Sequence, residues 1–319
     1  MYRLRLLDGR LKIRHLVLVD ALTRQGSVVG AAAALHISQP VATRTLQELE
    51  TILGVPLYQR GQYGVTPTTI GQAFTRHARA VLAQLSQAGR QVTELANPDR
   101  GTVVVGTYPG GSNMLLPQAI TELKGERPLL TVIVRQGSPE ALSVELEAGR
   151  IDLIVGRFTS PTPKSEIRMP LYDESIEIFT RAQHPLAQRR TIAFADLGDY
   201  PWIIPDTETA LRREMEQLFA RHAMPLPDNR IEVSSWFIIR HLLLKSDFIA
   251  ALPRPVALDE PSLRALPLSL ESIRHAVIGI TTAAGRALSP WANALIQSLQ
   301  TIATARLDDE SKAKFGAGR

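Results

Sequence analysis

The chain of 319 residues contains no cysteine. Disulfide bonds and thiolate chemistry are therefore excluded, and the composition suits a reducing cytoplasm. No run of about 18 or more apolar residues is present, so no membrane-spanning helix is predicted. Residues 1–22 are basic, but they lack the uninterrupted apolar core and the cleavage site of a signal peptide. We therefore expect a cytoplasmic protein with no membrane partner.

The common catalytic motifs are also absent. The sequence has no G-x-S-x-G nucleophile elbow, no G-x-x-x-x-G-K-[ST] phosphate loop and no H-E-x-x-H zinc motif. Gly106, Gly110 and Gly111 do not form a dinucleotide fingerprint, and the seven histidines show no ligand spacing. We expect no enzyme, no cofactor and no metal site.

Positive charge is concentrated in the first third of the chain. Residues 1–97 carry 11 Lys and Arg against 5 Asp and Glu, whereas the remainder carries 25 against 26. A basic module joined to a nearly neutral body indicates a polyanion, such as nucleic acid, as the partner of the module. The alternative is a solvated basic surface with no partner.

The basic third predicts three short helices, over residues 14–24, 28–35 and from Gln39 to about Leu53. Ser38 is a candidate N-cap of the third helix, and Pro40 falls in its first turn, where a missing N–H costs nothing. One face of this helix is purely apolar, and it consists of Ala42, Leu46, Leu49 and Leu53. The opposite face has no aliphatic residue, and it consists of Pro40, Thr43, Arg44 and Gln47.

Two further elements follow this helix-turn-helix pattern. Residues 57–60 and 65–66 flank a glycine-bracketed tip and predict a hairpin wing. A long helix then starts at Thr66 or Thr68 and runs to about Asn97. Its apolar residues recur with the heptad spacing of a dimeric coiled coil, and they are Phe74, Ala78, Val81, Leu85, Ala88, Val92 and Leu95. The alternative is an amphipathic helix that lies on its own domain.

From residue 102 onward, short apolar strands alternate with helices. This rhythm predicts an α/β body with parallel sheets, and roughly 200 residues exceed one compact sheet, so two lobes are expected. Ligands bind at the carboxyl ends of such strands, where four loops supply hydroxyl and N–H groups that suit a carboxylate or a polyol. Arg135 and Arg157 are candidates for added charge. The expected contacts are Thr107, Tyr108, Ser112, Asn113, Gln136, Ser138, Pro205, Thr207, Thr209, Ser234 and Trp236. The alternative for these polar residues is ordinary helix capping.

Residues 15–79 resemble the winged helix-turn-helix of the LysR-type transcriptional regulators. The segments GAAAAL, HISQPVATRTLQELE, LGVPLYQR and TPTTIGQAF carry this resemblance. It continues in order through GTVVVGT, VRQGSPEAL, GRIDLIVGR, HPLA, PWII and FIAALP, and it covers about residues 12–305. Its GRIDLIVGR and RHL segments are similar to a subgroup that includes regulators of aromatic-acid catabolism and of sugar uptake.

The resemblance implies an α+β multidomain fold. An N-terminal winged helix-turn-helix (1–68) and a long linker helix (69–97) would precede a two-lobed α/β domain of the periplasmic-binding-protein type (98–305). The chain would cross between the lobes near 172–180 and 263–281, and the polar segment 306–319 would be a flexible tail.

The resemblance also implies a sequence-specific regulator whose binding to double-stranded promoter DNA responds to an aromatic acid or a sugar. Linker-helix homodimers would assemble into homotetramers, with RNA polymerase as a further partner. The matching DNA-binding positions are Gln39, Pro40, Thr43, Arg44, Gln47 and Arg60. The wing GQYGVT is less basic than is usual in the family, which moves phosphate contacts toward Arg60. Ser246 and Asp247 replace glycines that the family often has, which puts an effector contact at that loop in doubt.

A solute-binding module for transport is the alternative function. The missing signal peptide and the basic first third argue against it. The identity of the effector, the promoter, the sign of regulation and the choice between dimer and tetramer are left open by the sequence.

Overall fold

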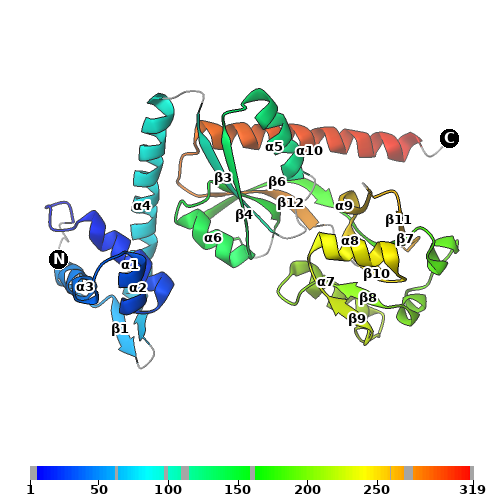
Figure 1. Ribbon diagram of the computed structural model, residues 1–319, viewed down its shortest axis with the longest axis horizontal. Coiled ribbons are helices and arrows are strands. Elements are labelled where there is room, and N and C mark those ends of the chain that lie inside the picture. Colours follow the sequence, from blue (N-terminus) through cyan, green and yellow to red (C-terminus); the bar gives the residue numbers. More distant parts are fainter. Residues whose placement is uncertain are drawn as a thin grey trace. The chain divides into compact units, whose positions relative to one another are not determined.

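The computed structural model describes residues 6–61, 64–96, 100–108, 115–158, 162–258, 260–268 and 276–316 (Figure 1). The chain divides into two compact units. The first consists of Met1–Pro98 with Ser143–Ile151, and the second of Asp99–Leu142 with Asp152–Arg319. No single helix among the described residues is long and apolar enough to cross a membrane. The helices Ile13–Gln25 and Val28–Ala34 reach the length and apolar composition of a membrane span only when the two are counted together, and the chain bends by 120° between them.

The N-terminal segment of the first unit contains four helices and a hairpin among its described residues. They are α1 (Ile13–Gln25), α2 (Val28–Ala34), α3 (Gln39–Leu53), the antiparallel strands β1 (Tyr58–Gly61) and β2 (Gly64–Pro67), and α4 (Thr69–Ala96). Gly26 and Gly54 end α1 and α3 in the left-handed conformation, with φ of 64° and 71°. The Ser27 and Thr68 hydroxyls accept N–H bonds at the starts of α2 and α4. Apolar residues of α1, α2, α3 and the hairpin form one core.

The first sheet of the second unit has the strand order β4-β3-β5-β12-β6. Its strands are β3 (Thr102–Thr107), β4 (Thr131–Gln136), β5 (Leu153–Arg157), β6 (Glu166–Glu174) and β12 (Ala276–Ala283). Helices α5 (Leu115–Glu126) and α10 (Pro290–Gly316) supply much of the core that packs against it (Figure 1). Helix α6 (Pro139–Glu147) follows β4, and the division between the two units falls inside it.

The second sheet has the strand order β11-β7-β10-β8-β9. Its strands are β7 (Ile176–Arg181), β8 (Trp202–Ile204), β9 (Arg230–Glu232), β10 (Ile249–Pro253) and β11 (Leu263–Ala265). Its helices are the short 3-10 helices η1 (Pro185–Gln188) and η2 (Phe194–Asp199), then α7 (Ala210–Arg221), α8 (Trp236–Lys245) and α9 (Arg254–Leu258). One core contains residues of η1, η2 and α7, and a second contains residues of α8 and α9.

Both sheets are mixed, so the expectation of parallel sheets is wrong in part. In each sheet three neighbouring strands are parallel, and two further strands pair antiparallel. The cause is the path of the chain, which leaves the first sheet at Glu174, enters the second at Ile176 and returns to the first as β12. A strand that arrives from the other sheet is free of the crossover helix that keeps βαβ strands parallel.

The segment 306–319, which is predicted to be a flexible tail, is helical over most of its length. Helix α10 continues to Gly316, and residues 317–319 lie outside the described part.

Candidate functional site

Helix α3 has two different faces. Ala42 and Leu49 are fully buried, and Leu46 is 7% exposed. Gln39, Pro40, Arg44 and Gln47 are exposed, whereas Thr43 is half-buried. The predicted separation of an apolar and a polar face is therefore confirmed. Val41 is an exception, because this aliphatic side chain is 47% exposed at the edge of the polar face.

Carboxylates at the back of α3 hold the helix in place. Glu50 Oε1 accepts N–H bonds from Leu57 at 2.7 Å and Tyr58 at 3.2 Å, which joins α3 to the hairpin. Glu48 Oε2 lies 2.9 Å from Arg14 Nη2 on α1. Ser38 occupies the predicted N-cap position with an extended backbone, but its side chain makes no capping bond. Sequence reasoning missed both glutamates, because their partners are set by the tertiary fold.

The turn before α3 is tight. His36 has φ of 53°, a left-handed conformation that is unusual for a residue other than glycine. Its N–H donates to the Ala33 carbonyl, and the Ile37 N–H donates to the Ala32 carbonyl. This turn determines the angle at which α3 leaves α2.

The hairpin is anchored through its backbone. The Val65 N–H donates to the Gly26 carbonyl at 2.8 Å, and a Cβ on Gly64 would lie only 2.3 Å from the same oxygen. Arg60 is paired with Val65 in the hairpin register, but its side chain lies outside the described residues. The predicted phosphate contact of Arg60 therefore stays a prediction.

The predicted heptad row of α4 splits into two parts. Ala78 is 1% exposed, and Phe74 packs against the core of the first unit, so both are used within one chain. Val81, Leu85 and Val92 are 47%, 46% and 69% exposed. Ala88 is exposed as well, and the Leu95 side chain lies outside the described residues. The early part of the row thus packs on its own domain, and the exposed part of the row begins at Val81.

The predicted ligand loops of the first sheet lie side by side. Thr107 ends β3 and Gln136 ends the parallel strand β4, and the Gly137 N–H donates to the Thr107 carbonyl at 3.3 Å. The Tyr108 ring lies where a Cβ on Gly156 of β5 would be. Burial, and secondly Glu166, raise the pKa of Tyr108 to about 12, so its hydroxyl stays protonated. Ser138 is half-buried, and Ser112 and Asn113 lie outside the described residues.

The predicted ligand loops of the second sheet also adjoin each other. The Ser234 hydroxyl accepts from the Asp206 N–H at 3.1 Å, which joins the loop at Pro205 and Thr207 to the loop after β9. The Thr209 hydroxyl caps α7 by accepting from the Arg212 N–H. Trp236 packs against the core formed by α8. The Thr209 hydroxyl thus caps a helix, as the alternative to ligand binding predicts, and the Ser234 hydroxyl accepts a hydrogen bond from a neighbouring loop.

Two charged side chains meet between the two sheets. Arg157, the last residue of β5, directs Nη1 to within 3.1 Å of Glu214 Oε2 on α7. The Arg157 side chain is 11% exposed. Burial raises the pKa of the Glu214 carboxyl above its ordinary value, while Arg157 acts in the opposite direction. Arg157 was a candidate from the sequence, but Glu214 was missed because no motif marks it.

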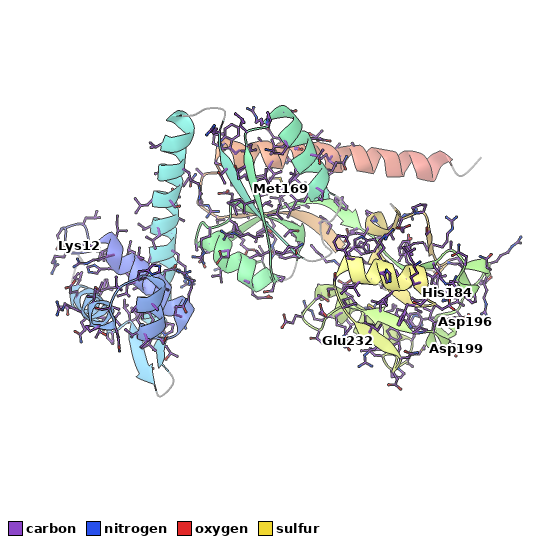
Figure 2. All side chains as sticks on the ribbon, in the orientation of Figure 1. Lys12, Met169, His184, Asp196, Asp199 and Glu232 are labelled. Carbon is purple, nitrogen blue, oxygen red and sulfur yellow. The ribbon has the colours of Figure 1, made fainter. Side chains whose placement is uncertain are left out.

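Asp247, at the position where the family often has glycine, has a structural role. Asp247 Oδ1 lies 2.8 Å from Arg181 Nη2, and its carbonyl faces Nε2 of the buried His184 at 3.2 Å. Figure 2 shows His184 within the second sheet's part of the unit, near Asp196 and Asp199 of η2. This loop is thereby engaged in holding β7 and η1.

Comparison with protein families gives two matches that together cover most of the chain. Residues 13–72 match the family described as "Bacterial regulatory helix-turn-helix protein, lysR family", and residues 96–303 match the "LysR substrate binding domain". The regulator PcaQ of Agrobacterium fabrum is 34% identical over 245 residues, 76% of this chain and 79% of that protein. The regulator GbpR of Azospirillum brasilense is 32% identical over 253 residues, 79% of this chain and 74% of that protein.

Solved structures share the fold. Full-length OxyR C199D from Pseudomonas aeruginosa superposes with a TM-score of 0.63 at 22% identity, covering 91% of this chain and 95% of that one. Full-length BenM gives 0.55 at 24% identity, covering 93% and 98%. CbnR in complex with its target DNA gives 0.52 at 22% identity, covering 92% and 100%.

Proposed function

The chain belongs to the LysR family of helix-turn-helix transcriptional regulators, and from this premise we propose which of its residues meet DNA and effector. Its family consists of DNA-binding regulators with an effector-binding domain, not of enzymes. The expected two-lobed fold of the periplasmic-binding type is confirmed, and nothing supports the alternative of a solute-binding module.

The proposed DNA-reading surface is the polar face of α3. An α-helix fits the major groove, where each base pair presents a distinct pattern of donors and acceptors. Gln39 and Gln47 offer amides to base edges, Pro40 and the Thr43 methyl can contact a thymine methyl, and Arg44 can bind guanine or phosphate. The observation that carries this proposal is the exposure of Gln39, Arg44 and Gln47 opposite the buried Ala42 and Leu49. Arg60 on the hairpin is the proposed additional phosphate contact.

The proposed assembly uses the exposed row of α4. Val81, Leu85, Ala88 and Val92 would pair with the same row of a second copy and form a homodimer. Two α3 helices would then meet half-sites about one DNA turn apart, roughly 34–36 Å. Dimers would join into a homotetramer that contacts RNA polymerase at the promoter. A protein that regulates promoter DNA works where the DNA is, so the proposed location is the cytoplasm.

The proposed effector site lies at the carboxyl ends of the parallel strands in both sheets. Thr107, Tyr108, Gln136 and Ser138 would contact the effector from the first sheet. The loops at Pro205, Thr207, Thr209, Ser234 and Trp236 would do so from the second. Ser112 and Asn113, which follow β3 in the sequence and lie outside the described residues, would join the contacts from the first sheet. An aromatic acid or a sugar is the proposed class of effector, and its binding would change the affinity of the protein for its promoter.

A gel shift with Arg44→Ala on DNA from the protein's own promoter region tests the DNA-reading surface. We expect loss of specific binding with the same oligomer size, because one bidentate base contact contributes about 1–3 kcal/mol in each half-site. Arg189→Ala is a matched control, since it also removes one exposed arginine but lies in the second unit. Unchanged promoter affinity in Arg44→Ala would exclude α3 as the reading helix.

A further inference from the structure

The Arg157 guanidinium is buried with part of its bonding capacity unused. Its side chain is 11% exposed, and Nη1 faces Glu214 Oε2 at 3.1 Å. Nε and Nη2 are both buried, and neither has a hydrogen-bond partner in the described part of the chain. A buried cation normally has its donors satisfied, because desolvation of an unpaired donor is costly. These two free donors therefore indicate a place for an additional acceptor.

The identity of the free atoms indicates which acceptor fits. Nε and Nη2 lie on the same edge of the planar guanidinium, so their two N–H bonds point in parallel. A carboxylate offers two oxygens at a matching separation and accepts both bonds at once. A sugar hydroxyl offers one oxygen and leaves the other donor unsatisfied.

Glu214 is an incomplete partner for Arg157. Its Oε2 atom is buried and accepts no hydrogen bond from the described residues, although it faces Nη1. Burial raises the pKa of this carboxyl, which shows that the site is unfavourable for its charge. Arg212, also on α7, has a different arrangement, with Glu216 at 2.8 Å and Glu232 at 3.1 Å. Glu214 thus lies near Arg157 but lacks the hydrogen bonds that a structural ion pair such as those of Arg212 makes.

The location of the pair agrees with a ligand role. Arg157 ends β5, next to β3 in the sheet, and Tyr108 covers the preceding Gly156. Glu214 lies on α7, the helix that follows the loop at Pro205 and Thr207. The contact between Arg157 and Glu214 therefore lies beside the two groups of loops that are proposed to bind the effector.

We propose that Arg157 binds an anionic group of the effector through Nε and Nη2, and that the Glu214 carboxylate at Nη1 is an internal anion that competes for the charge of Arg157. The inference rests on the proposed effector site and deepens it, because it selects an organic acid over a sugar. A carboxylate that binds Nε and Nη2 brings a second negative charge to the guanidinium, which weakens the contact between Arg157 and Glu214. Binding of the effector would thereby change the contact between Arg157 on β5 and Glu214 on α7.

Acetate is a suitable probe, because it carries the carboxylate and little else, and acetamide is its neutral counterpart. Acetate binding to the full chain would be measured by calorimetry and thermal shift in wild type, Glu214→Gln and Glu214→Gln/Arg157→Gln. In Glu214→Gln the competing anion is gone, so we expect the dissociation constant for acetate to fall by about tenfold or more. The double variant should lose this binding, and acetamide should bind none of the proteins.

Two further variants make the result decisive. Glu216→Gln removes a different carboxylate of α7, two residues after Glu214. This variant should bind acetate with the affinity of the wild type. Arg157→Lys retains the charge but lacks the paired donors, so it should bind acetate more weakly than wild type even where Glu214→Gln does not fold. Equal acetate affinity in wild type, Glu214→Gln and Arg157→Lys would overturn the inference. A gel shift with promoter DNA in the absence of acetate tests the regulator function by itself. Its failure can therefore be distinguished from a failure of acetate to bind at Arg157.

Discussion

Arg79 Nε on α4 lies 2.7 Å from Asp20 Oδ1 on α1, and each of these side chains is only 9% exposed. Arg24 Nη2 lies 3.1 Å from the other oxygen of Asp20. The linker helix is therefore joined to the helix-turn-helix by a buried charge as well as by apolar packing.

Arg79→Met should lower the free energy of unfolding of the first unit by about 2 kcal/mol. The substitution leaves the Asp20 carboxylate buried with less compensation, although Arg24 still faces it. Asp20→Leu combined with Arg79→Met removes both charges and should recover part of the loss. Urea unfolding followed by circular dichroism measures the effect, and Arg76→Met, at an exposed position of the same helix, is the control. Equal stability of Arg79→Met and Arg76→Met would show that the buried pair contributes nothing.

His36 should tolerate glycine or asparagine but not valine. Its φ of 53° is readily adopted by glycine and by asparagine, whereas a β-branched residue is strained there. We expect His36→Val to lose about 2 kcal/mol of stability and His36→Gly to stay within about 1 kcal/mol of wild type. Thermal unfolding and promoter gel shifts measure the two consequences. A valine variant that is as stable as the glycine variant would contradict the turn geometry.

Leu85→Glu should weaken the proposed dimer. Leu85 is 46% exposed in the single chain, and burying it against a second copy would be favourable, whereas two opposed glutamates would repel. The dimer dissociation constant should rise at least about a hundredfold, which corresponds to about 2.8 kcal/mol. Analytical ultracentrifugation measures it, with Gln84→Glu as a control of equal charge on the same helix. Identical dimerisation of the two variants would place the interface elsewhere.

His184 should make the second unit less stable in mild acid. Its Nδ1 accepts from the Leu186 N–H at 3.1 Å, and its Nε2 faces the Asp247 carbonyl at 3.2 Å, an arrangement that requires the neutral ring. Burial lowers the pKa of His184 below its ordinary value of 6.5. The unfolded chain therefore gains a proton before the folded chain does. The contribution of His184 to stability is complete above about pH 6.5 and is lost as the pH falls below that value.

His184→Asn tests this dependence, because asparagine can accept the Leu186 N–H bond but does not titrate in this range. The melting temperature of the wild type should fall more than that of His184→Asn between pH 7 and pH 5. A parallel decrease in both proteins would assign the acid sensitivity to other groups.

The pattern of α3 was readable from the sequence because helix periodicity is local. Apolar residues spaced at three and four positions place Ala42, Leu46 and Leu49 on one face whatever the rest of the chain does. Strand β6 was not predicted, since it contains Pro170, and a proline within a run argues against a strand. It forms as an edge strand through pairing with the distant β12, where a proline is tolerated.

Local periodicity, helix capping and charge distribution thus determined the apolar and polar faces of α3 and the alternation of strands and helices in the body. Only the tertiary structure decided which heptad residues remain exposed on α4, since Ala78 is covered by its own unit while Val81 is not. Only the tertiary structure brought Glu214 to Arg157. Contacts within a few residues follow from backbone geometry, whereas an ion pair between two sheets depends on how the chain crosses from one to the other.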